Sequence, residues 1–149
     1  EYSLEPSALA IRALVEHRDG PAAMPFALGL HPYLQVQSLQ DARLEGLPER
    51  CFDHLSAAEA STADQLQRLP EGVDLRVDPS SGSAPRLITG DERVELQMQA
   101  PFGHAVVWSD PPREMVCLEP WSARRGELSL ALQPGERCEL RCRYALTPA

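Results

Sequence analysis

A single glutamate in an otherwise apolar segment is the first residue of this sequence that could do acid–base chemistry. Glu119 follows the run Met-Val-Cys-Leu and precedes Pro120 and Trp121. Because proline has no N–H to give to a β ladder, we expect a strand to end at Pro120 and to hold Glu119 at its terminus, facing a cleft. Partial desolvation beside an aromatic ring raises the pKa of a carboxylate, which suits a general base. The alternative is a solvated glutamate at a strand end, because most glutamates are exposed.

A histidine far upstream is the second candidate for this chemistry. His31 lies in the segment Gly-Leu-His-Pro-Tyr-Leu, where Pro32 imposes an extended conformation on it and interrupts strand pairing. We therefore expect His31 at an exposed strand end or bulge, with the Tyr33 side chain on the same face. Without its flanking residues, such a histidine would be interpreted as an ordinary core or surface residue.

Short strands between turn signals must position these two residues. Strand-like segments recur along the chain, at residues 2–4, 9–15, 39–47, 72–77, 86–89, 93–99, 105–108, 128–132 and 138–146. Asp19-Gly20 is a strong turn signal, so segments 9–15 and 24–30 are expected to lie antiparallel. Residues 56–68 are compatible with a short helix or a loop. The pattern predicts an all-β, antiparallel β-sandwich, formed as a single domain by residues 1–149.

Composition and charge narrow the class of protein. The chain has 149 residues, enough to bury a core, and a net charge of −8; all 14 of its basic residues are arginine. Without a basic cluster, neither nucleic acid nor an anionic membrane surface is an expected partner. Without lysine, Schiff-base chemistry is excluded. No signal peptide and no long apolar run is present, which favours a cytoplasmic location.

The cysteines and histidines give no indication of a metal site. Cys51, Cys117, Cys138 and Cys142 include no CxxC pair, and Cys138 and Cys142 would lie too far apart along one strand to form a disulfide. We expect buried free thiols in a reducing compartment. No His or Cys pair has zinc-type spacing, so the sequence predicts neither a metal nor another cofactor.

Several ordered segments resemble the aldose 1-epimerase (galactose mutarotase) family. They are PFALGLHPYL, which contains His31-Pro32-Tyr33; EGVDLRV, which contains Asp74; AVVWSDPPREMVCLEPWSARRGEL, which contains Glu119-Pro120-Trp121; and the closing LQPGERCELRCRYAL. Together they cover most of the chain in the order of the family. Family members are considerably longer, so the chain resembles the C-terminal part of their large antiparallel supersandwich. The chain also begins at Glu1 rather than methionine, as expected either of a chain that starts within a protein or of one whose start has been processed.

The resemblance implies an isomerase that interconverts the α and β anomers of a hexose by acid–base ring opening and closure. On the matching residues, Glu119 would take the proton of the C1 hydroxyl and His31 would protonate the ring oxygen. Asp74 would hold a sugar hydroxyl, and Tyr33 or Trp121 would stack on the apolar face of the sugar. Glutamate and histidine, with ordinary pKa values of about 4.3 and about 6.5, suit these roles near neutral pH.

Departures from the family pattern leave alternatives open. Leu34 replaces the usual phenylalanine, the segment of Asp74 is a loose match, and the loop after Glu119 differs. In that loop, Arg124 and Arg125 are either solvated charges or a phosphate clamp, which would make the chain a hexose-6-phosphate 1-epimerase.

Further alternatives follow from the family motifs that the chain lacks. The N-terminal Asn-Arg and His-Gly motifs, which add sugar contacts in the family, have no counterpart, so a non-catalytic carbohydrate-binding domain of this fold is another candidate. A missing N-terminal half, or self-association through open sheet edges, would supply a partner. His17, His54 and His104 are expected to be structural, and the first two look exposed.

Overall fold

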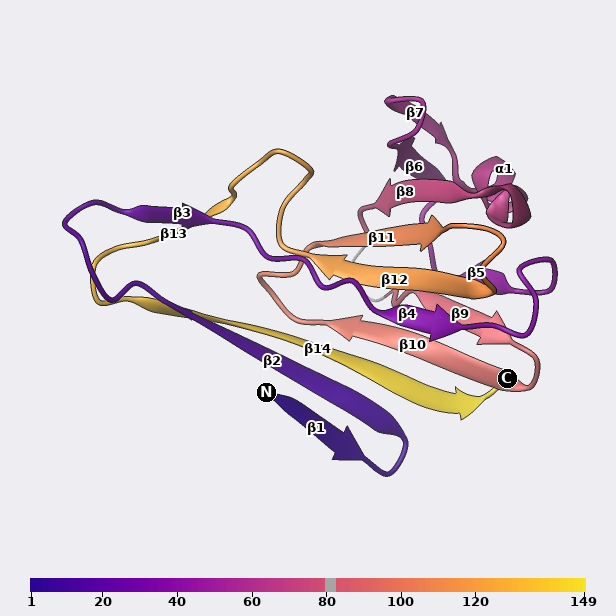
Figure 1. The fold of residues 1–149 in the computed structure, drawn as a ribbon, viewed down its shortest axis with the longest axis horizontal. Coiled ribbons are helices and arrows are strands. Elements are labelled where there is room, and N and C mark those ends of the chain that lie inside the picture. The colour runs from indigo at the N-terminus through magenta and orange to yellow at the C-terminus, as the bar shows by residue number, and fades with distance from the viewer. Residues whose placement is uncertain (80–82) are drawn as a thin grey trace.

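The chain folds as two packed antiparallel sheets with a projecting arm (Figure 1). The computed structural model describes residues 1–79 and 83–149. Sheet 1 contains, in spatial order, β1 (Tyr2–Glu5), β2 (Ala8–Glu16), β14 (Arg137–Pro148), β10 (Glu92–Met98), β9 (Arg86–Thr89) and β5 (Arg43–Glu45). Sheet 2 contains β4 (Tyr33–Gln35), β12 (Met115–Trp121), β11 (His104–Ser109), β8 (Val73–Val77), β6 (Arg50–Asp53) and β7 (Ala58–Ser61). The predicted antiparallel, all-β sandwich is confirmed.

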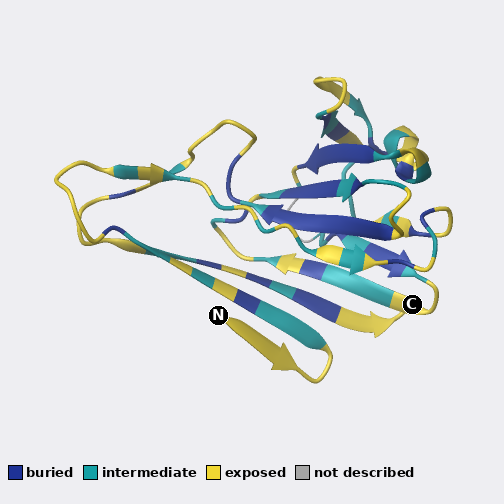
Figure 2. Cartoon of the chain, viewed as in Figure 1, coloured by how far each residue is buried: buried dark blue, intermediate teal, exposed yellow. Residues whose placement is uncertain are grey.

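The core lies between the sheets and is built from alternate residues of each strand. Val116 and Leu118 on β12 are fully buried against Leu140 and other apolar residues of sheet 1. Since side chains alternate along a strand, Cys117 and Glu119 point to the opposite face of sheet 2. That face is also covered, because β12 and β8 are buried along nearly their whole lengths (Figure 2). A strand that is covered on both faces can hold a polar group away from water.

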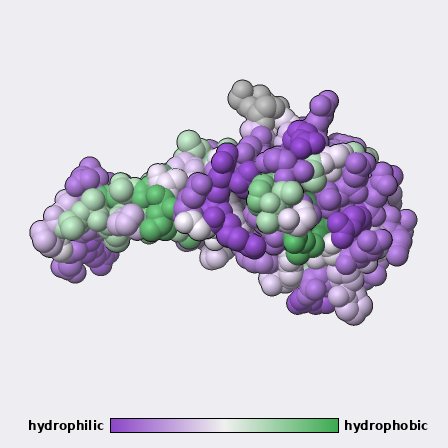
Figure 3. Space-filling model, turned by 90° about the horizontal axis from the view of Figure 1, so that it is seen from above, coloured by the Kyte–Doolittle hydropathy of each residue, from purple (hydrophilic) through white to green (hydrophobic). Residues whose placement is uncertain are grey.

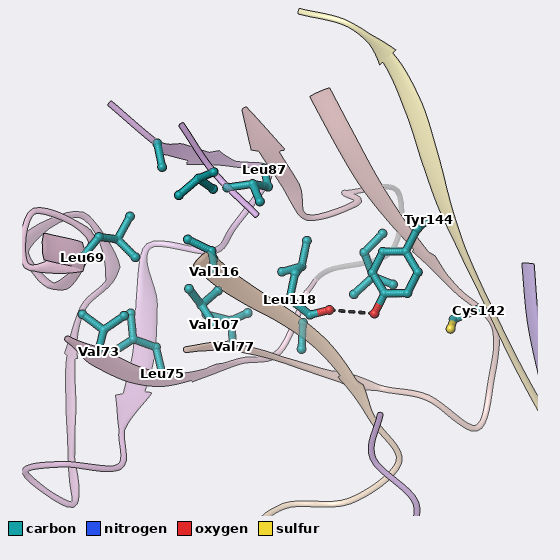
Figure 4. Packing of buried hydrophobic residues seen from close by; sticks show 14 of the residues in the cluster. Leu69, Val73, Leu75, Val77, Leu87, Val107, Val116, Leu118, Cys142 and Tyr144 are labelled. Carbon is teal, nitrogen blue, oxygen red and sulfur yellow. Dashed lines mark hydrogen bonds between the residues drawn. The ribbon is translucent and has the colours of Figure 1, made fainter. Parts of the chain in front are cut away.

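A hydrogen bond joins the two sheets through the core. Tyr144 on β14 donates its hydroxyl to the carbonyl oxygen of Leu118 on β12, at 2.7 Å (Figure 4). Burial of the Tyr144 ring raises the pKa of its phenol well above the ordinary value, so the hydroxyl keeps its proton. The bond therefore fixes the middle of β12 against sheet 1, one residue before Glu119.

The arm consists of a separate ribbon, β3 (Met24–Phe26) paired with β13 (Leu130–Leu132), together with the ends of β2 and β14 (Figure 1). Apolar residues gather on the arm, whereas the main body is largely hydrophilic on the side seen in Figure 3. Two hydrogen bonds of 2.9 Å between Leu28 and Ser122 attach the base of the arm to the end of β12. They also place the segment before His31 beside Trp121.

The expected pairing of segments 9–15 and 24–30 is wrong. Asp19-Gly20 does reverse the chain, with Gly20 at a φ of 98°. However, both edges of β2 are already paired, with β1 and β14. The second segment therefore leaves sheet 1 and pairs with β13.

Two further segments differ from the expected strands and loops. Within residues 39–47 only β5 forms, because a turn at Ser38, whose carbonyl accepts from the amides of Asp41 and Ala42, delays the strand. Residues 56–68 contain both β7 and a helix, α1 (Thr62–Leu66), which Ser61 caps by accepting from the amide of Asp64. A short 3-10 helix, η1 (Leu69–Glu71), then leads into β8. All four cysteines are free, as expected. None of the helices in the described ranges is long and apolar enough to cross a membrane.

Removal of the Tyr144 hydroxyl should destabilise the fold without disturbing its packing. We expect Tyr144→Phe to lower the free energy of unfolding by about 1 kcal/mol, the usual worth of one buried hydrogen bond. Urea denaturation followed by circular dichroism would measure the change. Tyr2→Phe is the matched control, because Tyr2 is largely exposed and its loss should be within about 0.5 kcal/mol of neutral. If Tyr144→Phe and Tyr2→Phe were equally stable, the Tyr144 hydrogen bond would not contribute to holding the two sheets together.

Candidate active site

The side chains that could do chemistry line the face of sheet 2 opposite the core, here called the site face. The strand register places Tyr33 beside Cys117, and Trp108 beside both Cys117 and Asp74. Residues directly opposite one another in a ladder share a face. By the same register the site face carries Tyr33, Cys117, Glu119, Trp121, His104, Val106, Trp108, Asp74, Arg76 and Phe52.

Glu119 is the more deeply buried of the two carboxylates on the site face, at 2% exposed against 9% for Asp74. The indole nitrogen of Trp121 donates to Oε2 at 2.9 Å, and His31 Nε2 lies 3.3 Å from Oε1. Burial raises the pKa of this carboxyl, whereas the Trp121 hydrogen bond and the His31 ring act in the opposite direction. The net pKa shift is upward, so the carboxylate is desolvated beside an aromatic ring, as the sequence predicted.

The expectation that the strand of Glu119 ends at Pro120 is wrong. β12 continues to Trp121, and Pro120 pairs with Ala105 of β11. In an antiparallel ladder the N–H and C=O of one residue point to the same neighbour. The carbonyl oxygen of Pro120 points away from β11 and accepts a hydrogen bond from the amide of Leu30 at 3.1 Å. The missing N–H of Pro120 would point to that same side, so the pairing with β11 tolerates the proline. Glu119 therefore lies within a strand rather than at its terminus.

His31 stands at the margin of the site face, with its side chain 49% exposed. Its ring stacks on Tyr33, with centroids 5.0 Å apart, and meets the edge of Trp108 at 5.2 Å. Two residues earlier, Gly29 lets the backbone lie against the indole of Trp121, because an added Cβ would lie 2.9 Å from Cδ1 of that ring. The predicted sharing of a face by His31 and Tyr33 is observed, and one side of the histidine stays open to solvent.

Asp74 lies within β8 and has two partners. Its Oδ1 is 2.7 Å from His54 Nδ1, and its Oδ2 accepts from Arg125 at 3.0 Å. The expectation of an exposed His54 is wrong, since its side chain is 4% exposed, between Phe52 and Trp121. The backbone amide of His54 donates to the Asp74 carbonyl and extends the ladder beyond β6, which is why the ring reaches the site face.

Sequence reasoning missed this contact because nothing in the local pattern around His54 marks it as buried. The expectation of an exposed His17 is wrong as well. That residue is buried at the end of β2, where Nε2 lies 2.9 Å from the Ala22 carbonyl oxygen.

The two loop arginines each face an acidic residue of β8 or its end. Arg125 pairs with Asp74, and Arg124 reaches Asp78 at 3.5 Å. Asp78 also lies 2.6 Å from Nδ1 of His104, which had been expected to be structural. Arg125 pairs with its carboxylate at 3.0 Å, whereas the one ion pair of Arg124 within residues 1–79 and 83–149 is longer, at 3.5 Å.

A hollow of about 290 Å³ opens at one end of the site face. It is lined by His31, Glu119, Trp121, Ala123, Arg124, Gly126, Glu127 and residues 27–30. A larger hollow of about 400 Å³ lies on the outer face of sheet 1, but its Arg12 and Arg143 pair with Glu139 and Glu5. Of these two hollows, the one on the site face combines a buried carboxylate with an exposed histidine.

Three potential metal ligands also come together here. Donor atoms of His31, Cys117 and Glu119 all lie within 4.8 Å of one another. Burial and the neighbouring Glu119 raise the pKa of the Cys117 thiol to about 12, so it is protonated at neutral pH. A protonated thiol is a poor ligand. Because Cys117 and His31 are distant in sequence, spacing alone could not have revealed this grouping.

No protein-family model matches the sequence, and no curated protein matches it. Solved structures do. The Slr1438 protein from Synechocystis sp. PCC 6803 is 22% identical with a TM-score of 0.89, over 99% of this chain and 53% of its own length. A galactose mutarotase-like protein from Clostridium acetobutylicum is 13% identical with a TM-score of 0.77, over 99% and 55%. One from Lactobacillus casei ATCC 334 is 18% identical with a TM-score of 0.70, over 98% and 61%.

The chain thus spans little more than half the length of these solved structures. The similarity extends over nearly all of its own residues, at low sequence identity. It confirms the expected resemblance at the level of the fold, and the chain has the galactose mutarotase-like fold.

Proposed function

We propose that the chain carries the acid–base pair of an aldose 1-epimerase acting on a hexose. The observation that supports this most directly is the buried Glu119 carboxylate, 3.3 Å from the open His31 ring at the edge of a hollow. The two oxygens that exchange protons in anomer interconversion are bonded to the same carbon, C1. A base and an acid that are close neighbours can therefore reach both.

In the proposed reaction, Glu119 takes the proton of the C1 hydroxyl while His31, protonated, donates a proton to the ring oxygen. The bond between C1 and the ring oxygen breaks, and C1 becomes an aldehyde. After rotation about the C1–C2 bond, the former ring oxygen attacks the other face of C1. His31 then recovers its proton from that hydroxyl, and Glu119 returns its proton to the C1 oxygen. The closure restores both residues.

The surrounding residues would orient the sugar and the catalytic pair. Trp121 holds the Glu119 carboxylate through its indole nitrogen and also lines the hollow, so its ring is available to the apolar face of a sugar. Tyr33 supports His31 by stacking. Asp74 would act in sugar binding, together with its partners.

A phosphorylated hexose is a second candidate substrate. Arg124 lines the hollow and is half exposed, and among the described residues its guanidinium has only the 3.5 Å contact with Asp78, so it could bind a phosphate. Arg125 is less suited to this role because it already pairs with Asp74. Glucose 6-phosphate would then be preferred to glucose, and Arg124→Ala would remove the preference.

Anomer exchange of glucose and galactose, measured by saturation-transfer NMR, tests the proposed reaction. The chain should accelerate exchange, and His31→Ala or Glu119→Gln should each reduce the enzymatic rate by about 10²-fold or more, the usual worth of general acid–base catalysis. Glu95→Gln, which alters a glutamate paired with Arg86 on sheet 1, is the control. If the folded wild-type chain binds a hexose without accelerating exchange, it is a carbohydrate-binding domain instead.

The pH profile should report the environment of Glu119. Because burial raises the pKa of this carboxyl, the acid limb of kcat/KM should lie above the ordinary glutamate value of about 4.3. The Trp121 hydrogen bond lowers the pKa, so Trp121→Phe should move that limb to higher pH. Rates corrected for spontaneous exchange would show this. If the acid limb does not move in Trp121→Phe, the Trp121 hydrogen bond does not influence the pKa of the catalytic base.

The proposed base should reduce the stability of the fold. The folded chain holds the Glu119 proton more tightly than the unfolded chain, so stability falls as pH rises from about 4.3 through the raised pKa. Glu119→Gln removes the buried charge and keeps an oxygen for the Trp121 N–H. We expect it to raise the free energy of unfolding by about 1 kcal/mol at pH 7, and to change little at pH 4. A variant that is less stable at pH 7 would contradict this.

A further inference from the structure

We propose that His54 is a sugar-contacting residue, whose Nε2 accepts a hydrogen bond from a substrate hydroxyl while Asp74 holds its ring. This inference rests on the proposed function, because it adds a contact to the same site. It also changes the expected role of Asp74, from a direct sugar ligand to a residue that orients His54.

The carboxylate of Asp74 is already occupied by protein partners. One carboxylate oxygen lies 2.7 Å from His54 Nδ1 and the other accepts from Arg125 at 3.0 Å. Asp74 itself is almost completely buried in β8. Both oxygens therefore have protein partners, and neither is presented freely to a ligand.

The ring of His54 is held in place by its neighbours. Its side chain is 4% exposed and packs against Phe52, with centroids 5.5 Å apart, and against Trp121 at 6.0 Å. The planes of His54 and Trp121 are only 21° apart, so the in-plane Nε2 atom does not point into the indole. A ring fixed on two sides and at Nδ1 has one orientation for its remaining nitrogen.

The second ring nitrogen of His54, Nε2, is available to a ligand. Within residues 1–79 and 83–149, Nε2 of His54 has no hydrogen-bond partner, and it is not among their buried polar atoms without one. With the side chain only 4% exposed, Nε2 therefore keeps a small surface open to solvent. A carboxylate only accepts hydrogen bonds, so Nδ1 carries the hydrogen and Nε2 of the neutral ring is an acceptor. A sugar hydroxyl is a suitable donor to it.

His54 and the proposed base, Glu119, both lie against the Trp121 side chain. Trp121 contacts both residues, since its nitrogen donates to Glu119 and its ring lies nearly parallel to His54. A hexose seated on Trp121 with C1 at Glu119 could therefore direct another hydroxyl to His54. His54 would thus fix which hydroxyl pattern is accepted, at some distance from the reacting carbon.

Two substitutions separate sugar contact from a purely structural role. The side-chain amide of His54→Asn can replace Nδ1 and keep the bond to Asp74, whereas that of His54→Gln can reach the position of Nε2. Affinities for glucose, galactose and their monodeoxy analogues, measured by NMR titration, are compared in both variants and in wild type. His17→Asn is the control, because His17 is a buried histidine in the arm.

We expect wild type to bind one deoxy analogue about 3- to 10-fold more weakly than its parent sugar, in line with the loss of one hydrogen bond. That penalty should disappear in His54→Asn, persist in part in His54→Gln and be unchanged in His17→Asn. If the penalty is the same in His54→Asn as in wild type, the proposed contact is wrong and His54 only supports Asp74.

A measurement on wild type alone keeps the proposal testable if the variants do not fold. With ¹⁵N-labelled histidine, saturating hexose should shift the Nε2 resonance of His54, and the effective deoxy analogue should not. An unchanged resonance would overturn the contact. Hexose binding with these effects but without anomer exchange would refute the proposed reaction and keep the His54 contact. If anomer exchange is accelerated but does not depend on His54, the proposed reaction stands and the His54 contact is refuted. If the wild-type chain binds no hexose, both proposals are refuted.

Discussion

Burial of the Glu119 carboxylate is the constraint on which the site depends. A charge within a sheet is costly unless neighbouring groups compensate it, and here the compensation comes from the Trp121 indole and the His31 ring. Each neighbour has its own requirement. Trp121 needs the absent side chain at Gly29, and His31 needs the stacking surface of Tyr33. The unusual local residues of both segments therefore serve one carboxylate.

The site and the core share the same strand, so they are mechanically linked. Leu118 packs in the core and accepts the hydrogen bond of Tyr144, while Glu119, the next residue, faces the other way. Because sheet 1 holds Leu118, it also determines the depth at which the carboxylate lies. The sandwich thus fixes the backbone position of Glu119, while Trp121 and His31 on the site face contact its carboxylate.

The sequence predicted the parts of the structure that depend on neighbouring residues. Pro32 restricts His31 directly, and the apolar run before Glu119 predicts a buried strand, so both positions could be inferred. The pairing of β3 with β13 and the burial of His54 could not, because they depend on residues far away in the chain. Pro120 was misjudged for the same reason: its missing N–H matters only in relation to Leu30, which lies in another segment.

The alternation of β12 has a consequence for divergence of the sequence. Residues of the two faces meet different neighbours, so Cys117 or Trp121 can be exchanged during evolution without repacking Val116 and Leu118. The fold depends on the core half of each strand, whereas the proposed activity depends on the half that lies on the site face. A lineage that changes its ligand can keep its architecture, which fits TM-scores of 0.70–0.89 at identities of only 13–22%. An insertion of one residue in β12 would be far less tolerable, because it would exchange the two faces.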